Sequence, residues 1–470
     1  MPTRPGVGHP YMPNAVAEIK DEMLRSIGAK NIESLFEQIP ADHRLKRKLD
    51  LPDGVRSEGE LKRHLMSVLS KNETCEQNLS FLGGDCWQHF VPAVCDEIVN
   101  RSEFLTPVWG TPSSDHGRNQ AWFEYCSQLG ELLNMEMVGL PVYSWACASG
   151  HAIRMASRLT RRNEVLVPRS ISPERLSVIR NYCEPPEMAN AIKVVLVDYD
   201  KKTGLLNLDD LKKKASKKAA AVYIENPSFI GVIESQGAKI VEIAHAVGAE
   251  AIVGIDAISL GVLTPPADYG ADIVTGTTQP LGVHMNCGGG TTGFIASRDD
   301  ARYIAEYPTL NISITETSKE GEFGFGLSSA HQSSYGMRDK GKDWTGNSTY
   351  LWAIANSVYM ALLGPDGFRE VGELILQRSA YAARRLGDIP GVRVAFSAPH
   401  FKEFVVNFDG TGKTVREINK TLRPHKIFGG LDLTKTFPEL GNSALYCVTE
   451  IHSQADIDRL ADTLREAVSK

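Results

Sequence analysis

The chain contains 470 residues, of which 42% are hydrophobic and 23% are charged, and its formal net charge is −6. These values are ordinary for a globular protein, and the acidic balance argues against a nucleic-acid-binding surface. The apolar runs are shorter than the roughly eighteen residues of a membrane helix, and the first residues lack the apolar core of a signal peptide. We therefore expect a cytoplasmic protein with no membrane segment and no nucleic-acid partner.

The eight cysteines are scattered along the chain. They form no Cys-x-x-Cys pair and have no histidine nearby at the spacing of metal ligands, so we expect reduced thiols and no metal site. A chain of this length exceeds the size at which a single hydrophobic core stops growing. We therefore expect a large domain and a smaller one, preceded by a helical N-terminal arm over residues 1–90.

Within the arm, apolar residues recur at helical spacing over residues 15–28, 32–38 and 57–71. Further along the chain, continuous apolar runs predict buried strands at residues 164–168, 192–198, 220–225, 250–256 and 293–296, with a short strand at 272–274. Helical patterns separate several of these strands, at residues 172–182, 208–217 and 237–247. This alternation predicts a parallel α/β sheet covered on both faces, in a large domain over residues 91–350.

The pattern changes after about residue 350. Long helical stretches are predicted at residues 350–363 and 367–387. They are followed by predicted strands at 392–396, 404–408 and 444–449 and by predicted helices at 415–422 and 457–468. We expect these elements to form an α+β C-terminal domain over residues 351–470.

A parallel sheet of this kind binds ligands beyond the carboxyl ends of its strands. Residues 146–150 precede a predicted helix at 151–159, so Ser149, Gly150 and His151 could approach a phosphate there, although the same pattern also serves as a simple helix cap. Asp256 ends a buried strand, where its carboxylate could pair with a protonated pyridine nitrogen or cap a turn.

No lysine occurs between Lys239 and Lys319. In fold-type-I pyridoxal-phosphate enzymes, a strand ending in aspartate is followed by a short strand, the cofactor-binding lysine and a glycine-rich turn. Here the order is kept, but Gln279 stands 23 residues after Asp256 where lysine is expected, before the glycines at 288–290. A glutamine amide forms no imine with an aldehyde, so we expect no catalytic residue in this chain.

Further stretches that match a single protein family are spread over residues 11–467, and together they are specific for that family. They lie at residues 81–84, 89–92, 103–106, 123–125, 225–231, 270–274, 279–282 with 288–289, 363–367, 401–404 and 449–452. With these stretches the chain resembles the glycine cleavage system P-protein family (glycine decarboxylase), in particular the α chain, or subunit 1, of its two-chain form. The resemblance implies a fold-type-I large domain with a parallel-rich sheet.

The resemblance also implies a division of labour between subunits. In the family the α chain lacks the lysine, and only the β chain carries pyridoxal phosphate; two α and two β chains assemble, and the α chain completes the interface around the working site. Glycine condenses with the cofactor, CO₂ leaves, and the aminomethyl group passes to the lipoyl arm of the H-protein. In this chain the resemblance leaves a vestigial cleft at Ser149, Gly150, His151, Asp256 and Gln279.

Three segments depart from the family pattern, at residues 107–117, 142–145 and 338–347. The candidate partner or substrate residues in them are Trp109, Asp115, His116, Trp145, Arg338 and Lys340. Aromatic side chains in such loops can anchor ligands or partners, and they can equally be ordinary packing. Two alternatives to the glycine decarboxylase subunit therefore stay open: a divergent paralogue acting on another small amine or amino acid, and a purely structural scaffold subunit.

Overall fold

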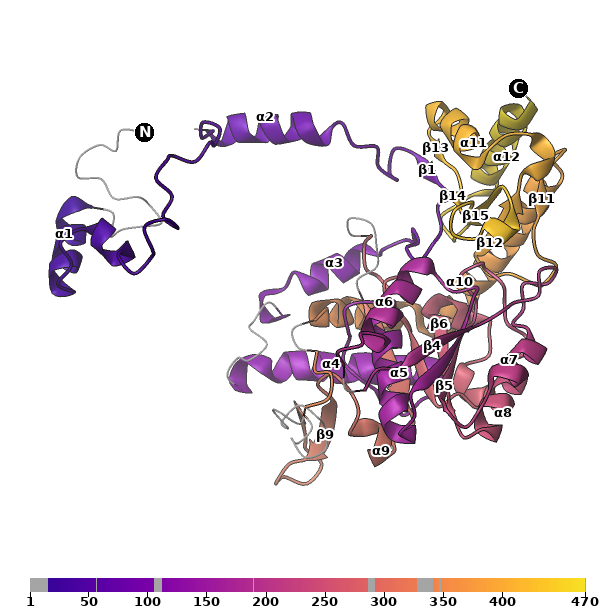
Figure 1. Ribbon diagram of the computed structural model, residues 1–470, viewed down its shortest axis with the longest axis horizontal. Coiled ribbons are helices and arrows are strands. Elements are labelled where there is room, and N and C mark those ends of the chain that lie inside the picture. The colour runs from indigo at the N-terminus through magenta and orange to yellow at the C-terminus, as the bar shows by residue number, and fades with distance from the viewer. Residues whose placement is uncertain are drawn as a thin grey trace. The chain divides into compact units, whose positions relative to one another are not determined.

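The structure is a computed structural model that describes residues 16–55, 57–104, 112–188, 190–285, 292–327, 341–345 and 348–469 (Figure 1). Of residues 112–117 it describes the backbone alone. The chain divides into two compact units, Met1–Glu73 and Thr74–Lys470. None of the helices in the described ranges is long and apolar enough to span a membrane.

The N-terminal unit contains α1 (Ala17–Ser26), the 3-10 helix η2 (Ile32–Phe36) and α2 (Glu58–Leu69). Polar caps set where two of these begin: the Asn31 side chain accepts from Ser34 N, and the Ser57 side chain accepts from Glu60 N. No residue of the three helices is buried. The predicted helices at 15–28 and 57–71 are confirmed with slightly shorter bounds, and the one at 32–38 is a 3-10 helix.

A seven-stranded sheet forms the centre of the second unit, in the order β2-β8-β7-β6-β5-β3-β4. Its strands are β2 (Met137–Val138), β3 (Glu164–Pro168), β4 (Lys193–Val197), β5 (Ala219–Glu225), β6 (Glu250–Asp256), β7 (Ile273–Thr277) and β8 (Gly293–Ser297). All neighbours from β4 to β7 pair in parallel, whereas β8 pairs antiparallel with both β7 and β2. The predicted strands are all present, and β8 makes the predicted parallel sheet a mixed, mostly parallel one.

The alternation of side chains along each strand explains why both faces of this sheet are covered. Val165 and Val167 lie in one hydrophobic core, while Leu166 between them lies in the other. Helices cover each side, and we call the sheet with these helices the large lobe. They include α3 (Ala93–Val99), α4 (Pro112–Leu133), α5 (Trp145–Thr160), α6 (Pro173–Cys183), α7 (Leu208–Lys214), α8 (Gly237–Ala246) and α9 (Ala301–Ile304), with η3 (Ser102–Phe104), η4 (Ala257–Gly261) and η5 (Pro266–Tyr269).

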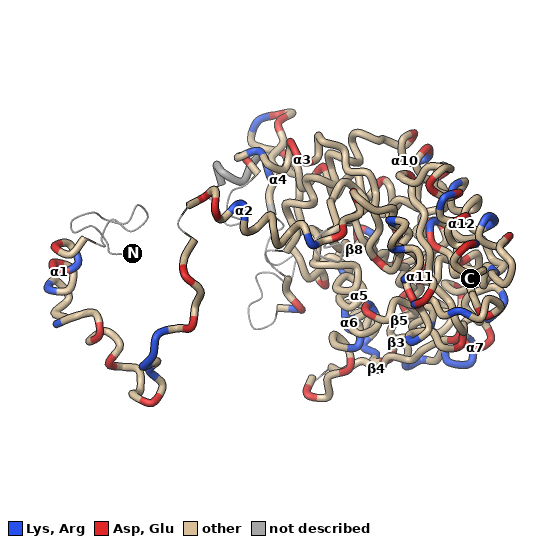
Figure 2. The backbone as a smooth tube through the Cα atoms, turned by 90° about the horizontal axis from the view of Figure 1, so that it is seen from above, with Lys and Arg blue, Asp and Glu red and all other residues tan. Residues whose placement is uncertain are grey.

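Two features of the large lobe differ from the sequence-based expectation. The segment 107–117, expected to be a loop, is helical from Pro112 onward because α4 begins there. A hairpin of β9 (Ile312–Glu316) and β10 (Phe323–Leu327) was not predicted; its strands pair antiparallel, and the residues of β9 are mostly exposed. Along the helices α10 (Tyr350–Gly387) and α12 (Gln454–Ser469), acidic and basic residues are interspersed (Figure 2).

The helix α10 (Tyr350–Gly387) leads from the large lobe to the C-terminal part of the chain. It breaks at Gly364, whose φ of 57° and ψ of −176° are not helical and which precedes Pro365. A proline lacks the N–H that would continue the helical hydrogen bonds, which explains the break. The break lies between the two helices that were predicted at 350–363 and 367–387.

The small lobe is built on a four-stranded antiparallel sheet in the order β11-β12-β15-β14. Its elements are β11 (Arg393–Val394), β12 (Glu403–Asn407), η7 (Asp409–Thr411), α11 (Val415–Leu422), η8 (Arg423–His425), β13 (Ile427–Phe428), β14 (Leu431–Asp432), η9 (Pro438–Leu440), β15 (Ser443–Cys447) and α12 (Gln454–Ser469). The strand β1 (Leu79–Ser80) pairs in parallel with β13. Residues just before the large lobe in sequence are thereby bound to the small lobe.

The lobes approach each other closely at Gly231, in the turn after β5. Gly231 has a φ of +88°, and a Cβ there would fall 1.9 Å from the backbone oxygen of Glu403 at the start of β12. Only glycine fits both the left-handed conformation and the contact. This residue therefore sets how near the carboxyl edge of the large sheet lies to the small lobe.

We expect Gly231→Ala to reduce the free energy of unfolding by at least about 4 kcal/mol, because the backbone strain is combined with a clash that neither main chain can relieve. Gly412→Ala is the matched control: Gly412 has a φ of +70°, but nothing lies within 4 Å of its Cβ position. The control should lose only about 1 to 2 kcal/mol. Urea unfolding of the two variants measures this, and equal losses would contradict the argument.

Candidate functional site

A cleft lies at the carboxyl ends of β5 and β6, between the large and small lobes. Its lining includes Asp85, Trp87, Trp145, Arg175, Asp256 and Lys402. Glu225 ends β5 and Asp256 ends β6, so the sheet delivers two buried carboxylates to neighbouring points of this edge. The free volume left inside is about 10 Å³, which is roughly the space of one water molecule.

Asp256 is held by the small lobe. Its Oδ2 lies 2.7 Å from the Nζ of Lys402, and both side chains are almost fully buried. Its Oδ1 accepts a hydrogen bond from Ile258 N at 3.3 Å and so caps the 3-10 helix η4. Asp256 thus lies at the sheet edge where the sequence places it, but its charge is already matched by an ammonium from this chain.

Lys402 makes two further contacts. Its Nζ lies 3.0 Å from His89 Nε2 and 3.5 Å from the centre of the Trp87 ring. A lysine ammonium can only donate, so His89 Nε2 must accept, and the proton of this neutral imidazole is on Nδ1. The Nδ1 lies 2.7 Å from Glu450 Oε2, which accepts that proton in a hydrogen bond. A continuous buried polar chain therefore runs from Asp256 to Glu450.

A second cation, Arg175 of α6, occupies the other side of the cleft. Its guanidinium donates to Glu225 Oε1 at 2.5 Å and to Asp85 Oδ1 at 2.7 Å. Its Cζ lies 3.7 Å from the centre of the Trp145 ring. Arg175 and Glu225 are both buried, so the arginine is paired with carboxylates on one side and with an aromatic face on the other.

The two tryptophans lie between the two cations. The ring centres of Trp87 and Trp145 are 6.4 Å apart, with the rings tilted by 58°. Arg175, Trp145, Trp87 and Lys402 therefore form one series of contacts across the cleft, which we call the cation–aromatic row. Gly254 in β6 makes room for it, because a Cβ there would come within 2.9 Å of the Trp145 indole nitrogen.

The sequence suggested that residues 146–150 precede a helix, but in the structure they lie inside one. The helix α5 begins at Trp145, because the Ser144 side chain caps it by accepting from Cys147 N at 3.2 Å. Ser149 and Gly150 therefore lie inside the helix and are buried. The Ser149 hydroxyl donates to Trp145 O and lies 3.0 Å from the Tyr223 hydroxyl, so it is bound within the protein.

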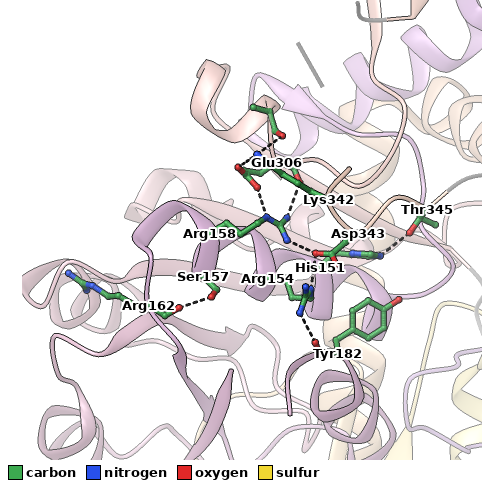
Figure 3. Close-up of polar contacts among 11 residues, drawn as sticks. His151, Arg154, Ser157, Arg158, Arg162, Tyr182, Glu306, Lys342, Asp343 and Thr345 are labelled. Carbon is green, nitrogen blue, oxygen red and sulfur yellow. Dashed lines mark hydrogen bonds and ion pairs between the residues drawn. The ribbon is translucent and has the colours of Figure 1, made fainter. Parts of the chain in front are cut away.

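His151 is not among the residues that line the cleft, and it contacts Thr345 (Figure 3). Its Nε2 is 2.9 Å from Thr345 Oγ1. Nearby, Asp343 accepts from Arg154 Nε at 2.7 Å and also pairs with Arg158. Glu306 pairs with both Arg158 and Lys342. These ion pairs hold residues 341–345 against the helix α5.

Gln279 is buried in the turn after β7. Its Nε2 donates to Val283 O at 2.8 Å, and its backbone N donates to Thr277 Oγ1 at 3.1 Å. The amide therefore stabilises its own turn. Trp145 was expected in a loop facing a partner, but it is in the first turn of α5 and only 5% exposed. Trp109, Arg338 and Lys340 lie outside the described residues, as do the side chains of Asp115 and His116.

The residues of the cation–aromatic row other than Trp145 were not identified from the sequence. Lys402 lies in the mostly apolar segment from Phe401 to Phe408. A lysine inside such a run is a usable signal, because a buried ammonium requires a nearby carboxylate. The sequence alone does not say which of the many carboxylates this is.

The sheet order and the cleft at its carboxyl edge define the class of protein, the fold-type-I pyridoxal-phosphate enzyme fold. Two solved structures share it at low identity. A sphingosine-1-phosphate lyase of Burkholderia pseudomallei matches with a TM-score of 0.64 and 15% identity, covering 92% of this chain and 94% of that one. A NifS-like protein matches with a TM-score of 0.60 and 12% identity, covering 83% and 99%. The expected fold class is confirmed.

The family is defined by longer matches. The model of the family described as glycine cleavage system P-protein matches residues 9–464, and the chain belongs to this family. The chain is 37% identical to a protein of Staphylothermus marinus named probable glycine dehydrogenase (decarboxylating) subunit 1, over 98% of this chain and 99% of the relative. It is also 37% identical to the protein of the same name from Thermococcus onnurineus, over 98% of this chain and 100% of the relative. A crystal structure of an inhibitor-bound glycine decarboxylase (P-protein) matches with a TM-score of 0.84 and 31% identity, covering 96% and 98%.

The cleft does not fit the pyridoxal phosphate that this fold family implies. Gln279, which the sequence places at the expected lysine position, is bonded within its own turn, and the charge of Asp256 is matched by Lys402. Sites for small molecules of cofactor size commonly enclose about 300 to 1,000 Å³. The cation–aromatic row leaves about 10 Å³. The chain's own side chains thus fill the cleft.

The buried His151 predicts a pH dependence of stability. Burial is the main cause that lowers the pKa of its imidazole to about 4; Asp343 opposes this, and Arg158 and Arg154 add to it. An unfolded histidine titrates near 6.5, so the unfolded chain binds more protons between about pH 6.5 and pH 4. The contribution of His151 is therefore complete above about pH 6.5 and is lost as the pH falls toward 4.

We expect His151→Gln to reduce the loss of melting temperature between pH 7 and pH 5, because glutamine does not titrate. The native chain should lose up to about 1.4 kcal/mol per pH unit through this group. His425→Gln, at an exposed position, is the matched control and should follow the native profile. Parallel profiles for the native chain and His151→Gln would refute the assignment.

Proposed function

We propose that this chain is the α chain, subunit 1, of a two-chain glycine dehydrogenase (decarboxylating). The main support is the similarity to proteins named as that subunit, which extends over nearly the full length of this chain and of those proteins. The filled cleft adds an independent reason. Gln279 at the expected lysine position and an occupied sheet edge support a chain that acts together with another chain.

The partner in this proposal is a β chain of the same family that carries pyridoxal phosphate, within a hetero-oligomer of α and β chains. There the cofactor supplies an electron sink for the carbanion left when glycine loses CO₂. The remaining aminomethyl group passes to the lipoyl arm of an H-protein. This chain contributes no catalytic group. Its part is to complete the interface around the partner's site with a rigid surface.

A divergent paralogue acting on another small amine or amino acid is the second candidate. It is favoured by the departures from the family pattern in segments 107–117, 142–145 and 338–347. Of these, residues 142–145 include Trp145, whose ring is part of the cation–aromatic row. That change belongs to the filling of the cleft, so it gives no support to an altered substrate.

Purified alone, the chain should show no absorbance from an internal aldimine and no decarboxylase activity. Combined with the β chain and the H-protein, it should release ¹⁴CO₂ from carboxyl-labelled glycine. The control is the β chain without this chain, which should be much less active because the interface is incomplete. Release of CO₂ from another small amino acid but not from glycine would favour the paralogue. Full activity of the β chain alone would contradict the proposed role.

A further inference from the structure

The Lys402 ammonium has three close neighbours within the chain. They are the Asp256 carboxylate at 2.7 Å, the His89 ring nitrogen at 3.0 Å and the face of the Trp87 ring at 3.5 Å. The side chain is buried, and the carboxylate beside it compensates its charge there.

The contacts of the row join the two lobes. Lys402 immediately precedes β12 of the small lobe, whereas Asp256 ends β6 of the large lobe. On the other side, Arg175 of the large lobe pairs with Asp85. The segment of Asp85 is bound to the small lobe, because Gly84 N donates to Glu403 Oε1 at 2.7 Å. Two ion pairs therefore cross the cleft at opposite ends of the row, one buried and one partly buried.

In enzymes of this fold, a carboxylate at the end of a strand pairs with the protonated ring nitrogen of the cofactor. We propose that Lys402 is an internal cation that takes this role at Asp256, so that the chain holds its lobes closed with its own side chains and takes up no pyridoxal-type cofactor. The two indole rings occupy the remaining space. This inference goes beyond the proposed function and does not depend on it.

The electrostatics of the pair give a distinctive expectation. Removing one partner of a buried ion pair leaves an uncompensated charge, whereas replacing both partners by neutral groups is far less harmful. Lys402→Met should therefore destabilise the chain more than the double variant Lys402→Met with Asp256→Asn. A residue that merely packed in the cleft would show additive losses instead.

The first experiment measures melting temperatures of the full chain and its variants. Lys402→Met should lower the melting temperature by about 5 °C or more, and adding Asp256→Asn should recover part of that loss. Lys420→Met, an exposed lysine on α11, is the matched control and should change it by no more than about 1 °C. If Lys402→Met does not fold, Lys402→Arg, which keeps the cation, should still give folded protein. Additive losses, or an unchanged Lys402→Met, would overturn the proposal.

The second experiment uses the native chain and pyridoxamine 5′-phosphate, which has no aldehyde and so forms no imines with surface lysines. Trp87 and Trp145 line the cleft, so their fluorescence reports its occupancy. We expect no saturable quenching and no rise in melting temperature on addition of the compound. Saturable one-to-one quenching together with a higher melting temperature would overturn the inference. Because neither experiment measures decarboxylation, failure here is distinct from failure of the proposed function.

Discussion

One buried ion pair, between the Lys402 ammonium and the Asp256 carboxylate at 2.7 Å, joins the two lobes at the centre of the cleft. Charges taken out of water are costly unless geometry and additional hydrogen bonds compensate them. Here His89 and the Trp87 ring complete the surroundings of the cation, and Glu450 in turn fixes the imidazole. The filling of this end of the cleft and the tautomer of His89 follow from the place of the Lys402 ammonium.

Under our proposal, this pairing lets the chain keep the fold of its family without binding the family's cofactor itself. A fold positions a site but does not prescribe what the site does. The sheet still delivers Asp256 to its carboxyl edge, and the turn that carries Gln279 is still ordered, through the hydrogen bond to Val283 O. The scaffold is retained, while arginine, lysine and two tryptophans occupy the space at its centre.

The sequence predicted those parts of the fold that rest on local pattern. The strands at 164–168 and 250–256 are continuous apolar runs, because both faces of the sheet are covered. The helix α4 was missed, since its polar residues are spread without a clear apolar stripe. At the site, Asp256 and Gln279 could be placed from their spacing, but Lys402 could not be assigned to Asp256. The two are far apart in the chain, and local pattern does not record which distant residues meet.

Gly254 shows a further consequence of this design. Its missing side chain lets the Trp145 indole lie on the strand ends, so the row forms as the chain folds. The conformational entropy of the two lobes is therefore lost once, during folding, and not when a ligand arrives. A surface ordered in advance loses little further freedom when another protein binds to it. In the assembly that we propose, a glycine in a central strand thus leaves the two lobes less freedom to lose when the partner binds.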